Sequence, residues 1–396
     1  MEHSGGEIVT KFRELWSLSD DDLEQDLIRM EYFNNKKVWH QLTLHLLTMF
    51  QKPSMRVDKR KLELYQNFIA SIEYKVDPLS LMRLVEHIVP PASAEKPAGS
   101  ILESQDALAF LDKIEPKIKN HPEAVILSKI RRGRILLLSL QDKDAAKKVV
   151  EETEVLLNAL DGITSVHAPF YLLVSDLARI DADHAAYYRS ALRYLGCLKD
   201  EEWKALETAD KEERALHLSL AALLGEGIYN FGELLAHPIL ESLKSTSNAW
   251  VGDLLLAFNS GDITCFEKLM PQIQSQPDLS RFLLSLRQKI CLLCLMEMTF
   301  KRPALNRQLS FADIAAETKL PEPEVELLVM KALSLGLVNG TIDQVASKVN
   351  LTWVQARVLD RSQMQTLITR LDKWCSDIKH MEIMMEGQAK EIIAHT

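Results

Sequence analysis

Helical spacing of the apolar residues, from residue 8 to about residue 300, limits the fold of this chain more than any other feature. Two clear examples are Trp39, Leu42, Leu46 and Met49, and Tyr187, Ala191, Tyr194 and Leu198. Steps of three and four residues place each set on one stripe of a helix. A chain with this spacing is expected to form amphipathic helices that bury one side each.

Turn-forming residues are scarce. The 396 residues include 14 Gly and 14 Pro, about 3.5% each against typical values of about 7% and 5%. Stop signals fall at Gln51-Lys52-Pro53, Asp77-Pro78, His121-Pro122, Asp161-Gly162 and His237-Pro238. They leave helical segments of about 12 to 25 residues with no fixed period. We therefore expect an irregular, solenoid-like array of antiparallel helix pairs.

Charge and apolar content narrow the class of protein. The formal net charge of −9, from 47 basic and 56 acidic residues, disfavours a chain built around nucleic acid or an anionic membrane. The longest apolar run, residues 290–296, is followed at once by Glu297 and is too short to span a membrane. The first residues show no secretory signal, and five Cys suit a reducing compartment. We expect a location in the cytoplasm and nucleus.

One segment has the composition of a linker. Residues 90–100 contain three Pro, several small residues and almost no apolar bulk. Such a composition is typical of an exposed loop. A docking role for this loop is the alternative.

The pattern changes after residue 303 and predicts a winged helix. Ser310 is the expected N-cap of a short helix, with Asp313 three residues on. A turn at residues 320–323 leads to a second helix that ends at Gly336. Its apolar stripe comprises Val325, Leu328, Val329, Ala332 and Leu333. Two β-like runs follow, at residues 337–343 and 349–354, with the turn expected at 344–347 in preference to Asn339-Gly340.

The last segment, residues 361–393, predicts one long helix with a heptad seam. The seam positions are Met364, Leu367, Leu371, Trp374, Ile378, Met381, Met385, Gln388 and Ile392, of which only Gln388 is polar. Alternating steps of three and four residues are the pattern of helices that pack in bundles or coiled coils. We expect the seam to enter a bundle of partner helices; folding back on the same chain is the alternative.

Catalytic and cofactor motifs are not found. The sequence has no phosphate-binding loop, no His pair for zinc and no nucleophile elbow. The glycines of residues 225–232 are expected to make a turn between helices, and Cys291 and Cys294 are expected to be core thiols. We therefore expect no enzyme activity, no cofactor and no metal.

Basic residues are not arranged for nucleic acid. Residues 303–360 contain five basic and seven acidic residues. The expected second helix contains three glutamates, Glu322, Glu324 and Glu326, and one basic residue, Lys331. Phosphate would be repelled there. The one basic cluster, residues 131–134, is expected to be a solvated helix edge, with binding of an acidic protein partner as the alternative.

Helical repeats, a winged helix and a terminal helix together resemble the PCI-domain family of scaffold subunits. The resemblance lies in residues 39–44, 165–167, 170–171, 223–227, 230–235, 292–300, 302–304, 325–333, 352–355 and 357–360, in that order. Among PCI-domain proteins, these blocks are similar to a subunit of the proteasome lid. The resemblance implies helical repeats at 1–185, the helical part of a PCI domain at 186–302, a winged helix at 303–360 and a bundle helix at 361–396.

The resemblance further implies a function and a set of contacts. It implies a non-catalytic structural subunit of the 26S proteasome regulatory particle lid, which supports assembly of the complex that degrades ubiquitylated proteins. In that family, winged helices pack side by side and terminal helices form a bundle, so the chain would be part of a hetero-oligomer with other lid subunits. The implied contacts are Val338, Gly340, Ile342, Trp353, Arg357, Leu367, Leu371, Trp374, Ile378, Met381 and Met385.

Other assemblies that use PCI domains remain open at this stage. The alternative is a PCI-type scaffold subunit of the signalosome, of a translation initiation complex or of an mRNA-export complex. A nucleic-acid adaptor would need a basic wing or second helix, which this sequence lacks.

Overall fold

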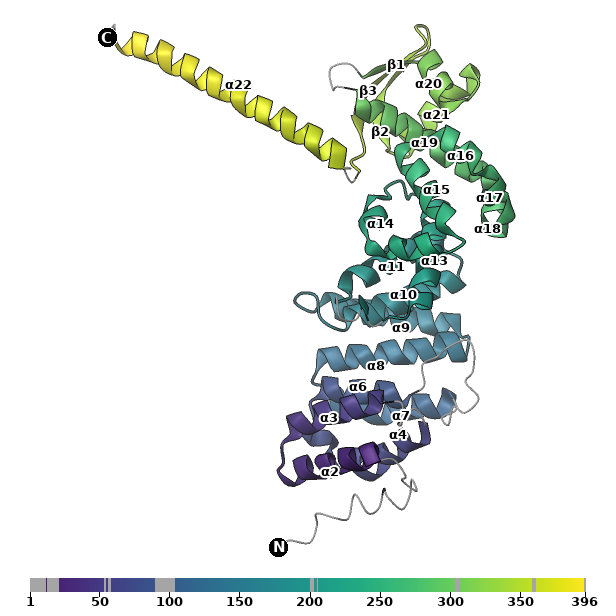
Figure 1. Cartoon of the computed structure of the whole chain (residues 1–396), viewed down its shortest axis with the longest axis vertical. Helices are drawn as coiled ribbons and strands as arrows, with labels where there is room; N and C mark the ends of the chain where they lie inside the picture. The colour runs from purple at the N-terminus through teal and green to yellow at the C-terminus, as the bar shows by residue number, and fades with distance from the viewer. Residues whose placement is uncertain are drawn as a thin grey trace. The chain divides into compact units, whose positions relative to one another are not determined.

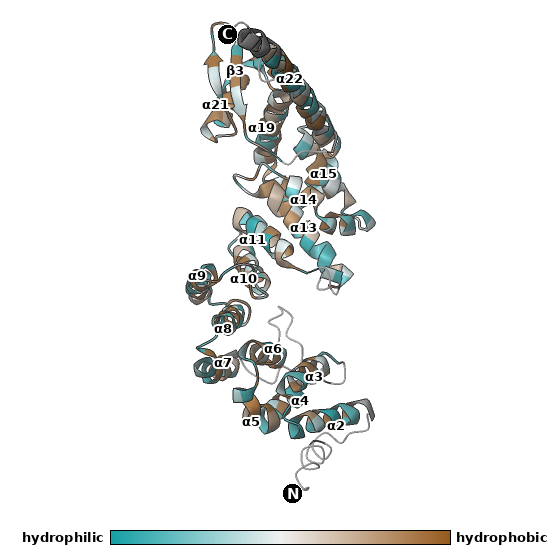
Figure 2. Ribbon diagram, turned by 90° about the vertical axis from the view of Figure 1, so that its left-hand side faces the viewer, coloured by the Kyte–Doolittle hydropathy of each residue, from teal (hydrophilic) through white to brown (hydrophobic). Residues whose placement is uncertain are grey.

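The computed structural model divides the chain into two compact units, residues 1–203 and 204–396, here called unit 1 and unit 2 (Figure 1). The residues that the structure describes are 12, 21–52, 55, 58–89, 104–199, 203–204, 206–302, 307–357 and 361–394. The exposed loop expected at residues 90–100 lies outside them. In both units the helices combine hydrophobic and hydrophilic segments (Figure 2).

Unit 1 is an array of helices. Its α-helices are α2 (Asp21–Asn35), α3 (Trp39–Gln51), α4 (Asp58–Leu64), α5 (Ala70–Ile72), α6 (Pro78–Ile88), α7 (Ser104–Ile118), α8 (Pro122–Arg134), α9 (Lys143–Asn158), α10 (His167–Ile180) and α11 (His184–Cys197). Short π- and 3₁₀-helices complete it: η2 (Tyr65–Ile69), η3 (Glu73–Lys75) and η4 (Ile135–Ser139). Helix α8 packs against α6, α7, α9 and α10, and one hydrophobic core runs through the array.

The expected breaks are confirmed, and their chemistry explains them. Asp77 caps α6 by accepting a hydrogen bond from the Ser80 backbone N–H at 3.0 Å, and Pro78 occupies the first turn. Pro122 likewise opens α8. Gly162 takes φ +85°, a left-handed conformation that suits glycine, between α9 and α10. The sequence pattern therefore located the ends of these helices.

The two helical stripes are buried to different degrees. Leu42, Leu46 and Met49 of α3 are fully buried, as expected. In α11 only Tyr194 of the stripe is buried, and Tyr188 and Leu195 complete the buried side. The expected boundary at 185/186 falls at the start of α11, which packs against α10 and so belongs to unit 1.

Unit 2 begins with further helices and ends with the winged helix and a long helix. Its helices before the winged helix are α13 (Thr208–Leu224), α14 (Gly232–Ala236), the 3₁₀-helix η5 (Pro238–Ser245), α15 (Ala249–Ser260), α16 (Ile263–Lys268), α17 (Met270–Ser275), α18 (Pro277–Arg281) and α19 (Leu283–Lys301). Helix α19 packs against α13, α15 and α16 and also against the winged helix. It is the central helix of this unit.

The winged helix has the expected helices, α20 (Phe311–Thr318) and α21 (Glu322–Ser334). The Ser310 hydroxyl caps α20 by accepting from the Asp313 backbone N–H at 3.1 Å. At the end of α21, Gly336 takes φ +67°, and the N–H groups of Gly336 and Leu337 donate to the carbonyls of Leu333 and Ala332. This bonding is a Schellman cap, so Gly336 stops the helix as expected.

The sheet differs from the expected two-stranded wing because it has a third strand. Strands β2 (Val338–Asp343) and β3 (Lys348–Val354) form the hairpin with its turn at 344–347, and β1 (Gln308–Ser310) pairs with the other side of β3. Three residues are too few for a strand pattern to be recognised in sequence. Asn339-Gly340 is not the turn but lies within β2, where the register with β3 shifts by one residue and leaves Thr352 of β3 without a register partner. A Cβ on Gly340 would lie 2.9 Å from the Cα of Leu351.

The last element, α22 (Arg361–Ala394), confirms the expected long helix. It appears in yellow in Figure 1. No described helix is long and apolar enough to cross a membrane.

Candidate partner-binding surfaces

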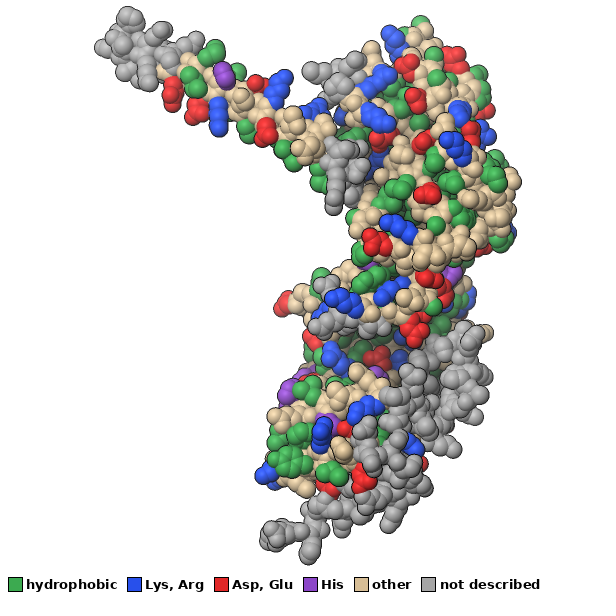
Figure 3. Space-filling model, in the orientation of Figure 1, with side chains coloured by type: hydrophobic (Ala, Val, Ile, Leu, Met, Phe, Trp, Pro, Cys, Tyr) green, Lys and Arg blue, Asp and Glu red, His purple; other side chains and the backbone are tan. Residues whose placement is uncertain are grey.

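The seam of α22 is exposed along its whole described length. Every described side chain from residue 364 to residue 386 is exposed. The apolar seam residues are Leu367 (47% exposed), Leu371 (48%), Trp374 (65%), Ile378 (55%), Met381 (67%) and Met385 (67%). Hydrophobic side chains occur among acidic and basic ones along this helix (Figure 3). Such a stripe is unusual on a monomer and typical of an interaction surface.

The second surface is the edge of the sheet. Strand order β1-β3-β2 places β2 at one edge, where among the described strands it has no partner on its outer side. The Val338 side chain is buried, and Gly340 and Ile342 are half-buried. These residues can therefore offer a partner mainly the backbone of the strand. An edge of this kind can pair with another chain.

Trp353 and Arg357 lie at the end of the β3 segment but differ in environment. Trp353 pairs with Asn339 in the hairpin, and 46% of it is exposed. Arg357 instead contacts two helices of unit 2. Its Nη1 donates to the Asn259 carbonyl of α15 at 3.0 Å, and its Nη2 forms an ion pair with Glu297 of α19. Its guanidinium is thus engaged within the chain. The structure brings Val338, Gly340 and Trp353 together in one hairpin, and the α22 residues form a separate group.

The anchor formed by Arg357 and Glu297 was not expected from the sequence. Glu297 is 8% exposed and lies four residues before the end of α19, and Arg357 lies four residues before the start of α22. The ion pair ties the segment that leads to α22 to the central helix. The sequence did contain a signal for this ion pair. Glu297 directly follows the longest apolar run, and a carboxylate buried there requires a partner.

The basic cluster of residues 131–134 is not a solvated edge, and that expectation was wrong. Arg131 is 5% exposed and donates to the carbonyls of Glu86, at 3.1 Å, and Val89. Burial lowers its pKa to about 10. Arg132 pairs with Asp112 at 2.7 Å, and Arg134 lies 3.8 Å from Asp176. Because these charges are matched within unit 1, the cluster does not form a free site for an acidic partner either.

The two cysteines of α19 and the glycine-containing turn after α13 have structural positions, as expected. Cys291 and Cys294 are buried in α19, and burial raises the pKa of Cys294 to about 12. The turn after α13 is closed by Lys289, whose Nζ donates to the carbonyls of Ala222, Leu223 and Gly225 at 2.8–3.0 Å. Among the described residues no cluster of His, Cys, Asp and Glu could hold a metal ion.

The architecture defines a class of protein, and comparison with known proteins agrees with it. A helical array followed by a winged helix is the arrangement that the resemblance to PCI-domain scaffolds implied. The family model described as the PCI domain matches residues 267–353. A second model, PSD13 N-terminal repeats, matches residues 26–255, which is more than half of the chain.

Two proteasome relatives are similar to this chain over nearly their whole length. The chain is 35% identical to the "Probable 26S proteasome regulatory subunit rpn9" of Schizosaccharomyces pombe, over 94% of both chains. It is 33% identical to the "26S proteasome non-ATPase regulatory subunit 13" of Dictyostelium discoideum, over 94% of this chain and 95% of the relative. The chain therefore belongs to the family of the 26S proteasome non-ATPase regulatory subunit 13, and the expected resemblance to a lid subunit is confirmed.

A translation initiation relative is more distant. The chain is 26% identical to "Eukaryotic translation initiation factor 3 subunit M" of Neosartorya fischeri, over 52% of this chain and 43% of the relative. The alternative assembly is accordingly less supported than the proteasome.

Proposed function

We propose that this chain is a non-catalytic structural subunit of the 26S proteasome regulatory particle lid, where it supports assembly of the complex that degrades ubiquitylated proteins. Its partners are other lid subunits, which it contacts through the edge of the winged-helix sheet and through α22. Such a role implies a location in the cytoplasm and nucleus. Family membership supports the assembly, and no cofactor, nucleic acid or membrane enters the proposal.

The exposed seam of α22 is the observation that carries the proposal. A helix of 34 residues is about 50 Å long, and its seam exposes Leu, Ile, Met and Trp side chains over the described part. Burial of such a stripe against partner helices would gain about 25 cal/mol per Å² of apolar surface. The several Met side chains suit an irregular seam shared by more than one partner.

The test is a pair of seam substitutions in the full-length chain. Leu371→Asp with Ile378→Asp places two charges in the seam and should abolish co-purification with the lid. Thr369→Asp with Ser376→Asp adds the same charges to the opposite side of α22 and should leave co-purification intact. Equal recovery of lid subunits with both double variants would contradict the proposal.

A further inference from the structure

A further apolar surface lies on the winged helix, on α21 and on the turn between β2 and β3. Helix α21 exposes Leu327 (64%) and Met330 (52%), three residues apart and therefore on one side of the helix. Val345, in the turn of the wing, is 100% exposed. The Gln344 side chain donates to Glu326 of α21 at 3.2 Å, so the wing turn lies beside this helix. We call the surface of Leu327, Met330 and Val345 the helix–wing face.

The charges around the helix–wing face are mainly acidic. Glu322, Glu324 and Glu326 lie on α21 before Met330. Two basic side chains lie nearby: Lys331, which donates to the uncharged Gln288 of α19 at 2.8 Å, and Lys348, which is the register partner of Asp343 in the hairpin. Glutamates in the first turn stabilise a helix N-terminus, which accounts for Glu322 and Glu324. The same explanation does not apply to Glu326, which lies after the first turn, or to the exposed apolar residues Leu327 and Met330.

We infer that the helix–wing face binds a basic amphipathic helix of a partner protein, one that presents Leu-like side chains flanked by Lys or Arg. The apolar pair would provide the contact area, and the three glutamates would select a basic partner by charge complementarity. The same charges disfavour nucleic acid, which is the ligand that a helix and wing bind in many winged helices. The residues of this face, Leu327, Met330 and Val345, are not among the contacts proposed for β2 and α22, so its failure would leave the proposed function intact.

The probe is a labelled Leu/Lys peptide of about 18 residues, or about five helical turns. A Leu/Glu peptide with the same Leu positions is the control for charge. Both are titrated against the full-length chain that carries Leu371→Ser and Ile378→Ser, which makes the α22 seam less apolar and adds no acidic group that could attract the peptide. We expect the Leu/Lys peptide to bind and the Leu/Glu peptide not to bind at low salt.

Variants of the face then locate the binding. Leu327→Ser with Met330→Ser should weaken binding of the Leu/Lys peptide by about tenfold or more, since two apolar contacts are lost. Leu284→Ser, at a 79% exposed position of α19, should change it by less than about twofold. Glu322→Gln, Glu324→Gln and Glu326→Gln together should weaken binding and reduce its salt dependence. All substituted side chains are at least partly exposed, so unfolding curves should be unchanged.

Three outcomes would overturn the inference. Binding that is equal in the Leu327/Met330 and Leu284 variants would show that the peptide binds elsewhere. Equal binding of the Leu/Glu peptide would remove the role of the glutamates. Sedimentation of the chain alone could show dimers that disappear with Leu327→Ser and Met330→Ser, in which case the occupant is a second copy of this chain.

Discussion

Helices α19 and α22 are the two longest helices of unit 2 and lie in opposite environments. Of the 19 residues of α19, eleven are buried, including every residue from Lys289 to Glu297. Of the described side chains of α22, none is buried. Both helices carry many Leu, Ile and Met residues, so apolar content alone does not decide which helix enters the core of its own chain.

The difference lies in how the apolar residues are spaced. Helix α19 is apolar on all sides around residues 290–296, which is typical of a helix that is surrounded. Helix α22 confines its apolar residues largely to a heptad seam, which suits one side of a bundle. Because α19 is buried on all sides, its charged residues Lys289 and Glu297 require partners within the chain. The exposed charged residues of α22 do not.

The largest contrast is expected from the same substitution in each helix. Leu293→Asp places a carboxylate at a fully buried position of α19 and should lower the free energy of unfolding by about 5 kcal/mol or more. Leu371→Asp, at a 48% exposed position of α22, should change it by less than about 0.5 kcal/mol. Urea unfolding of both variants measures this contrast, and equal losses of stability would show that the two helices do not differ in burial.

Removal of one arginine at each helix should give a smaller difference in the free energy of unfolding. Arg357→Met leaves Glu297 of α19 without its main partner and should cost about 3 kcal/mol. Arg370→Met acts on an exposed side chain of α22 and should cost less than about 0.5 kcal/mol. Chemical denaturation again provides the measurement. Arg357→Met combined with Glu297→Met should recover part of the loss, and no recovery would show that the ion pair is not the cause.

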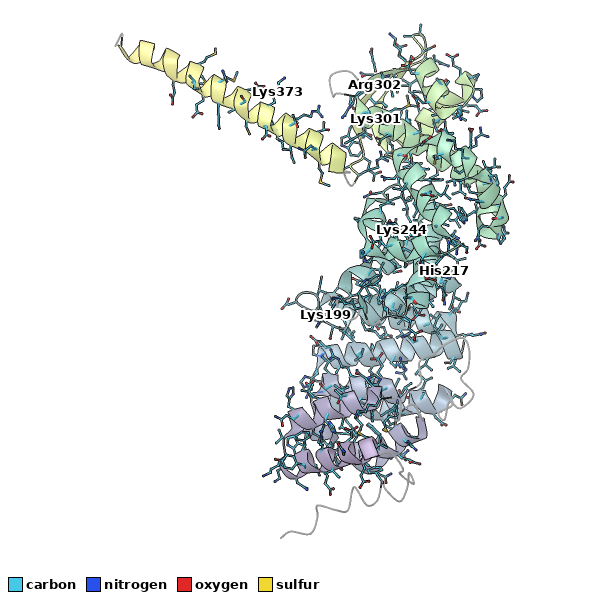
Figure 4. The ribbon with its side chains drawn as sticks, viewed as in Figure 1. Lys199, His217, Lys244, Lys301, Arg302 and Lys373 are labelled. Carbon is cyan, nitrogen blue, oxygen red and sulfur yellow. The ribbon has the colours of Figure 1, made fainter. Side chains whose placement is uncertain are left out.

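Lys289 of α19 should contribute to the pH dependence of stability. Burial lowers the pKa of Lys289 from 10.5 to about 7. The unfolded chain therefore holds this proton up to a higher pH than the folded chain, and the free energy of unfolding should rise between pH 7 and 10 by at most about 1.4 kcal/mol per pH unit. Lys289→Met should remove this contribution, and Lys373→Met on α22 (Figure 4) should not.

Identical slopes in wild type and Lys289→Met, measured by urea unfolding at several pH values, would show that the Lys289 proton is not linked to folding. Other titrating groups contribute equally to both proteins, so the difference between the two slopes is the quantity to compare.

Thiol labelling should separate the helices without any effect on stability. Cys375 of α22 is exposed, and Cys291 and Cys294 of α19 are buried with raised pKa values. A thiol reagent should modify Cys375 in the folded chain and the other two only on unfolding. Peptide mass spectrometry over time measures this order. Modification of Cys291 as fast as Cys375 in the folded chain would contradict the burial of α19.

Local signals in the sequence were enough for most of the fold. Asp77-Pro78, Ser310 with Asp313, and Gly336 each act through bonds to nearby backbone, so their effect is readable within a few residues. The heptad seam of α22 is likewise local. The contacts proposed for Val338, Ile342 and the α22 seam stay predictions, because a partner and not this chain would reveal them.

Long-range pairings could not be read from the sequence. Arg131 looked solvated because Arg132 and Arg134 adjoin it, but the carbonyls that it binds belong to Glu86 and Val89, more than 40 residues away. The Arg357–Glu297 pair and strand β1 were not predicted for the same reason, because each depends on segments that meet only after folding. Charge density along the chain gives no information about such partners.

We propose that α22 serves assembly and adds nothing to the stability of its own chain. The most direct test is the thermal unfolding midpoint of the chain ended at residue 360, compared with that of the full-length chain. Because the described side chains of α22 are all exposed, we expect the two midpoints to agree within about 2 °C. A midpoint lowered by about 10 °C or more would show that α22 packs against its own chain and is not reserved for partner helices.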